Sequence, residues 1–154
     1  LAFCIVEKHE TPWCRHSQPE ESDGLQLWID TRDVHNVHRA TKFCHRFLFM
    51  PSGSGSDSRS PVVQWLPINR AKSQPNPIPD GIIKAKTLWF SDGYQIDVFI
   101  PAIALTGFDP EQYPRLGFNF SVRDREVGDY VFSAGPPMPY KEDPSLWATL
   151  QLVR

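Results

Sequence analysis

Prolines and glycines divide this chain into short pieces, and this feature limits its possible folds more than any other. The 154 residues include fifteen prolines and nine glycines, too many for long helices. Between these breaks, apolar and polar residues alternate with the period of two that is typical of half-buried strands. We expect strands at residues 2–7, 25–31, 43–50, 62–66, 82–90, 94–100, 115–123, 130–134 and 147–153.

Turn signals between these pieces predict how the strands are connected. The sequence Ser-Asp-Gly at 91–93 separates two strands and favours a tight hairpin. A polar low-complexity segment at 51–61 is expected to be a surface loop. Short strands at regular spacing predict an all-β fold, a two-sheet antiparallel β-sandwich of jelly-roll-like form, with residues 1–154 as a single module.

Charge and composition exclude several classes of protein. The formal net charge is −2, and the basic residues form no stripe that could neutralise a run of phosphates, so we expect no nucleic-acid partner. No apolar run approaches the roughly 20 residues that a membrane span needs. The odd number of cysteines, without a C-x-x-C pair, predicts no disulfide framework, although a single Cys4–Cys14 or Cys14–Cys44 bridge is possible.

The period of two assigns the side chains of each strand to opposite faces. In the strand at 25–31, Leu25, Leu27 and Ile29 point one way, while Trp28 points the other way with polar neighbours. The strand at 43–50 places His45 on its apolar side, where we expect a core histidine that is hydrogen-bonded to backbone. The second face mixes aromatic with polar residues.

That mixed face has the composition of a sugar-binding surface. Sugars stack their C–H faces on aromatic rings, while planar polar side chains bind their hydroxyls. We expect the face to point outward, with Trp13 and Tyr140 as possible clamps from loops. The predicted ligand-binding residues are Trp28, Arg46, Gln95, Asp97, Asn119, Arg123 and Tyr140.

Metal and haem sites are the alternatives. His35 and His38 form a His-x-x-His pair on a loop, and are weak candidates for transition-metal ligands. Haem would require an axial ligand such as Met50 or Met138, but methionine more often fills a core. We therefore predict no firm metal site.

Four segments, in this order along the chain, resemble carbohydrate-binding module family 9 and the related DOMON-like sandwich domains. They are DGLQLWIDTRD at 23–33, GYQIDVFIPAIAL at 93–105, RLGFNFSVRDRE at 115–126 and PSLWATLQLV at 144–153.

The resemblance implies a noncatalytic sandwich module that binds sugars and is exported as part of a longer protein. Family members usually begin with further strands before the segment that resembles residues 1–7, so we expect the first strands to be missing. The family sandwiches a sugar ring between two tryptophans, and Tyr140 stands where the second would be. Trp89 and Trp147 lie in the apolar alternation of their strands, and we expect both in the core. Some resembling modules bind calcium, for which Asp30 and Asp33 are weak candidates. DOMON-type relatives can bind haem or metal.

Sequence motifs of catalysis do not point to an enzyme. The chain contains no nucleophile elbow in a strand–turn–helix context, no phosphate-binding glycine loop and no H-E-x-x-H. The resemblance likewise implies an accessory module, in an extracellular or periplasmic location, whose partners are carbohydrate and the other domains of its parent protein. The alternatives are a haem- or metal-binding DOMON-type domain and a purely structural accessory module.

Overall fold

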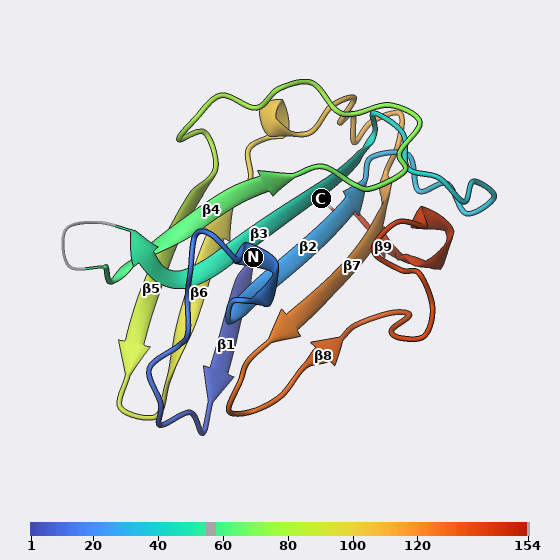
Figure 1. Ribbon diagram of the computed structural model, residues 1–154. Coiled ribbons are helices and arrows are strands. Elements are labelled where there is room, and N and C mark those ends of the chain that lie inside the picture. Colours follow the sequence, from blue (N-terminus) through green and yellow to red (C-terminus); the bar gives the residue numbers. More distant parts are fainter. Residues whose placement is uncertain (55–57, 154) are drawn as a thin grey trace.

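The computed structural model describes residues 1–54 and 58–153, and within them the chain forms nine strands (Figure 1). Three one-turn 3-10 helices are η1 (Pro19–Glu21), η2 (Ala102–Ala104) and η3 (Pro144–Leu146). The strands are β1 (Ala2–Val6), β2 (Gly24–Asp30), β3 (Cys44–Ser54), β4 (Ser60–Leu66), β5 (Lys84–Phe90), β6 (Gly93–Phe99), β7 (Arg115–Arg123), β8 (Tyr130–Val131) and β9 (Ala148–Gln151).

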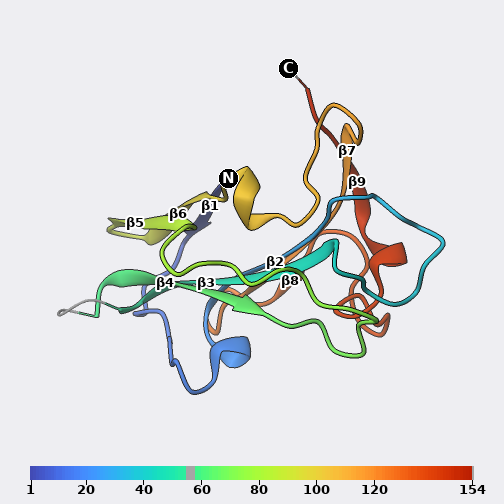
Figure 2. The same ribbon diagram turned by 90° about the horizontal axis from the view of Figure 1, so that it is seen from above.

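The strands form two antiparallel sheets, which lie one over the other in Figure 2. The smaller sheet has the order β1-β6-β5, and the larger has the order β4-β3-β2-β7-β8, with β9 also paired to β7. This arrangement confirms the predicted all-β sandwich. The predicted hairpin is also present, since Phe90 of β5 pairs with Gly93 of β6. β3 and β4 extend into the predicted loop at 51–61, of which residues 55–57 lie outside the described residues.

The main core lies between the two sheets and confirms the predicted faces. Leu25, Leu27 and Ile29 of β2 are buried there, and they pack in one cluster with Ile96 and Val98 of β6. His45 is fully buried beside this core, and its Nε2 accepts a hydrogen bond of 2.9 Å from the backbone N–H of Thr106. This confirms the prediction for His45. Burial lowers the pKa of His45 to about 4, so the ring is neutral at neutral pH.

A second core covers the opposite face of the larger sheet. Trp28 packs edge-to-face on Tyr140, with ring centroids 5.5 Å apart. The indole N–H of Trp147 donates a 2.7 Å hydrogen bond to the Tyr140 carbonyl, which fixes the C-terminal segment over the sheet. All seven residues of β2 are buried as a result. The prediction that this face points outward is therefore wrong around Trp28, and the expected core position of Trp147 is confirmed.

The segment between β1 and β2 crosses from the smaller sheet to the larger and is held by one buried lysine. The Lys8 ammonium lies 2.9 Å from Asp124 Oδ1, and 3.5 Å from both Asp23 Oδ2 and Glu126 Oε2. The side chains of Lys8, Asp23 and Asp124 are at most 2% exposed. Although burial alone would lower the pKa of Lys8, its carboxylate partners raise it, so the ammonium stays charged.

The three cysteines form no disulfide bonds, and the helices of the described residues are one turn each. Cys4, Cys14 and Cys44 are free, so neither of the two possible disulfide bridges is formed. Among residues 1–54 and 58–153, no helix is both long and apolar enough to span a membrane.

Candidate functional site: a hollow on the larger sheet

Three of the predicted ligand-binding residues lie in one row across the larger sheet. Trp28 of β2 is in register with Arg46 of β3 on one side and with Asn119 of β7 on the other. Trp28 and Asn119 have no exposed surface, and Arg46 is 4% exposed. The row therefore lies beneath the C-terminal segment. It is not the open platform that the alternation predicted.

Gln95 and Asp97 do not belong to this face. Both lie on β6 in the smaller sheet, and the Gln95 amide donates a 2.6 Å hydrogen bond to Asp97 Oδ1. The prediction that they share one surface with Trp28 is wrong, because a period of two identifies a strand's faces but not the sheet that the strand joins.

Arg123 and Tyr140 line a hollow of about 280 Å³ on this side of the larger sheet. Tyr140 itself is only 6% exposed, and the Arg123 guanidinium donates to the Glu20 carbonyl at 3.1 Å. The remaining lining residues are Glu20, Gln26, Ser121, Val122, Asp129, Val131, Pro136 and Lys141.

Arg46 connects two of these lining residues. Its Nη2 donates a 2.6 Å hydrogen bond to the side-chain carbonyl of Gln26, and the same atom lies 2.8 Å from Glu20 Oε2. The hydrogen bond from Arg46 lowers the pKa of Glu20, so this half-exposed carboxylate is ionised at neutral pH. The hollow therefore presents a carboxylate, an amide and charges of both signs, which can accept from and donate to hydroxyl groups.

The buried row beside the hollow contains hydrogen-bond donors without acceptors. Among the described residues, Trp28 Nε1, Arg46 Nε and Asn119 Nδ2 have no hydrogen-bond partner. The other amide atom of Asn119 is used, since its Oδ1 accepts from the backbone N–H groups of Phe120 and Ser133. Unpaired buried donors are rare in folded proteins, so three of them in one row need an explanation.

The other candidates from the sequence have partners within the protein. Trp13 is not free to clamp a ligand, because the guanidinium groups of Arg15 and Arg125 lie 5.4 and 3.4 Å from its ring centre.

The weak metal candidates also have protein partners. Asp30 accepts hydrogen bonds from two backbone N–H groups, His35 lies 2.9 Å from Asp33, and His38 lies 3.1 Å from Asp143. Across the described residues, no group of three or more His, Cys, Asp or Glu side chains is arranged to hold a metal ion. A bound calcium therefore stays a prediction.

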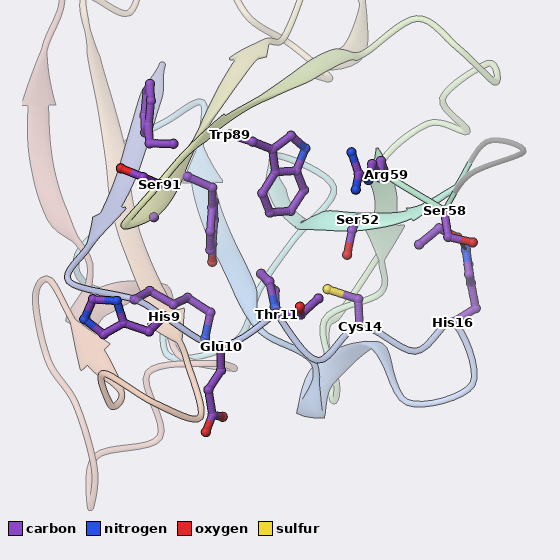
Figure 3. Close-up of a pocket in the computed structure, with 16 residues that line it drawn as sticks. His9, Glu10, Thr11, Cys14, His16, Ser52, Ser58, Arg59, Trp89 and Ser91 are labelled. Atoms are coloured by element: carbon purple, nitrogen blue, oxygen red, sulfur yellow. Dashed lines mark hydrogen bonds between the residues drawn. The ribbon is translucent and has the colours of Figure 1, made fainter.

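A larger cavity of about 650 Å³ lies at another place in the sandwich (Figure 3). It is formed by the segment after β1, the end of β3, the residues just before β4, and the β5–β6 hairpin. Trp89, which its strand pattern predicted to be in the core, is instead 41% exposed at this cavity. None of the predicted ligand-binding residues lines it.

Structural comparison identifies known proteins of the same architecture. A family 9 carbohydrate-binding module (CBM9) from Caldicellulosiruptor kristjanssonii, in complex with cellotriose, superposes with a TM-score of 0.62 and 13% identity, over 98% of this chain and 69% of the other. The same kind of module in complex with glucose gives a TM-score of 0.65 and 14% identity, over 99% and 71%. The fold is that of a CBM9 module. No protein-family model and no curated protein matches the sequence.

Within this CBM9-like fold, sequence reasoning missed several residues of the hollow. Gln26 and Ser121 share the parity of Trp28 and Asn119, so the alternation contained the signal for them. Glu20 lies on the one-turn helix η1, and Asp129 and Lys141 lie on turns or loops, where no periodicity indicates the direction of a side chain. Arg46 was among the predicted ligand-binding residues, and the structure adds its two partners, Glu20 and Gln26.

Proposed function

We propose that this chain is a noncatalytic carbohydrate-binding module that binds sugar at the hollow lined by Glu20, Gln26, Arg123 and Tyr140, with Arg46 behind Glu20 and Gln26. The observation that carries the proposal is the position of the Arg46 guanidinium. Its Nη2 contacts both the Glu20 carboxylate and the Gln26 amide, and so holds these two planar groups side by side at the edge of the hollow. Planar groups of this kind form the paired hydrogen bonds that adjacent sugar hydroxyls need. The CBM9 fold, seen with cellotriose and glucose in other proteins, supports the same class of ligand.

The charge pattern supports a neutral ligand. The hollow combines Glu20 and Asp129 with Arg123 and Lys141, so that neither sign dominates. An anionic ligand would face two carboxylates and a cationic ligand two basic groups, whereas hydroxyl groups can use both. The small volume, below the usual 300–1,000 Å³ of ligand pockets, suits one sugar ring with the rest of a chain outside.

Calorimetric titration with cellotriose and with glucose tests the proposal. Glu20→Gln keeps the shape of the side chain but removes the charge that accepts from a sugar hydroxyl. We expect the dissociation constant to rise about tenfold, which corresponds to the loss of one charge-assisted hydrogen bond. Tyr140→Phe removes only the phenol hydroxyl and should weaken binding by a smaller factor.

A matched control comes from the same strand as Arg123. Arg115 lies at the far end of β7 and its side chain is 61% exposed, so Arg115→Ala should leave sugar affinity unchanged, whereas Arg123→Ala should weaken it. Equal affinity of Glu20→Gln, Arg123→Ala and the unmodified protein for both sugars would contradict the proposal.

The cellular setting belongs to the same proposal. An extracellular or periplasmic module attached to other domains would bring its parent protein to a polysaccharide without altering it. Detection of the parent protein in the culture medium or periplasmic fraction, bound to insoluble cellulose, is the expected result. Retention of the parent protein in the cytoplasm would contradict this part of the proposal.

A further inference from the structure

The cavity in Figure 3 is separate from the proposed sugar site. No residue lines both, and the cavity is formed mainly by the segment after β1 and by the β5–β6 hairpin. Its volume of about 650 Å³ lies in the middle of the range for small-molecule sites. We propose that this cavity is a second, independent binding site for a neutral pyranose ring, which stacks on Trp89.

Trp89 supplies the stacking surface. Its indole extends into the cavity, with Ser52 and Cys14 on the opposite side (Figure 3). The ring is held in place by Tyr94, whose centroid lies 5.8 Å away. An indole that is 41% exposed in a concave site contrasts with Trp28 and Trp147, which are buried. A fixed aromatic wall of this kind loses little conformational entropy when a flat ligand binds.

Polar groups around the indole match the hydroxyls of a sugar. Thr11, Ser52, Ser58 and Ser91 line the cavity, and each hydroxyl can donate and accept. Tyr94 lies among the lining residues, is 1% exposed, and its hydroxyl has no hydrogen-bond partner among the described residues. A ligand hydroxyl at the base of the cavity can supply that partner, and so compensate a polar group that the fold leaves unpaired.

The charges in the cavity favour a neutral ligand over an anion. The charged residues that line the cavity, Lys8, Glu10 and Arg59, carry both signs, and the Lys8 ammonium is bound by three carboxylates. Burial raises the pKa of Cys14, so the thiol stays protonated and adds no charge at neutral pH. A phosphate-binding site would instead need unpaired cations or a group of converging backbone N–H donors. An aromatic wall with neutral hydroxyls is the pattern expected for a sugar ring.

The test uses the indole N–H signals of the five tryptophans in ¹⁵N-labelled protein, titrated with glucose and with cellotriose. Trp89→Ala assigns the Trp89 signal and removes the stacking surface. Phe99→Ala is the matched control, because Phe99 is a 64% exposed aromatic residue on the same sheet that does not line the cavity. Tyr94→Phe removes only the buried hydroxyl.

We expect either sugar to shift the Trp89 signal in a saturable manner, and Tyr94→Phe to raise the dissociation constant of that transition several-fold. Saturation-transfer NMR, which observes the ligand, should detect at least a tenfold loss of cavity binding in Trp89→Ala and no loss in Phe99→Ala. Glu20→Gln should leave the Trp89 transition unchanged, so failure of one site is distinguishable from failure of the other. A Trp89 signal that neither sugar moves, or that inorganic phosphate moves instead, would overturn the proposal.

Discussion

Replacement of Lys8 by methionine tests whether the buried ion cluster holds the two sheets together. Methionine keeps the length of the side chain but leaves the carboxylates of Asp23 and Asp124 buried without their cation. Loss of one partner from a buried ion pair typically costs 3–5 kcal/mol. The carboxylates keep backbone donors, because Asp23 accepts from Trp13 N–H at 3.0 Å and Asp124 from Glu126 N–H at 2.9 Å. We therefore expect the lower end, about 3 kcal/mol.

The free energy of unfolding in urea measures this cost, and thermal unfolding should show a fall of about 6–12 °C for a chain of this size. Lys86→Met, at an exposed lysine of β5, is the control and should change stability by less than about 0.5 kcal/mol. Because the cluster is buried, added salt should not abolish the difference between the two variants. A loss below about 1 kcal/mol in Lys8→Met would refute the reasoning, since that is the scale of a surface ion pair.

Two further changes probe the two cores. The pKa of His45 is lowered to about 4 in the folded chain. At a pH below the ordinary pKa of histidine, the unfolded state therefore binds more protons than the folded state, and acid destabilises the fold. Stability should fall by about 3 kcal/mol between pH 7 and pH 4 through this group, and urea unfolding of His45→Gln should lack that part of the decrease. Trp147→Phe should lower stability by about 1–3 kcal/mol, because the Tyr140 carbonyl loses its donor; an unchanged urea midpoint would contradict this.

The alternation of residues predicted the architecture because it is a local property with a direct physical meaning. A strand with Leu25, Leu27 and Ile29 on one side must bury that side, and the structure does so against β6. The same rule placed His45 on the core side. The turn at residues 91–93 was predicted equally well, since its residues prefer the backbone angles of a tight hairpin.

The site was predicted less well, because alternation does not show what covers a face. Trp28 and Asn119 were assigned to the correct side of their strands, but the segment that buries them is rich in proline and has no periodicity. Gln95 and Asp97 were placed with them because the pairing of distant strands is not encoded in local patterns. The error for Trp89 is the opposite one. The alternation of its strand predicted a buried side chain, but the indole is partly exposed at the cavity in Figure 3.

The contact between Lys8 and Asp124 also constrains the order in which this protein can fold during synthesis. The two residues are 116 positions apart, so the ammonium leaves the ribosome long before its strongest partner is made. β1 also depends on β6 (Gly93–Phe99), with which it pairs and which is made only a little before Asp124. Stable docking of β1 is therefore expected only after β6 and the end of β7 have been synthesised, and until then its apolar side chains stay exposed on the emerging chain.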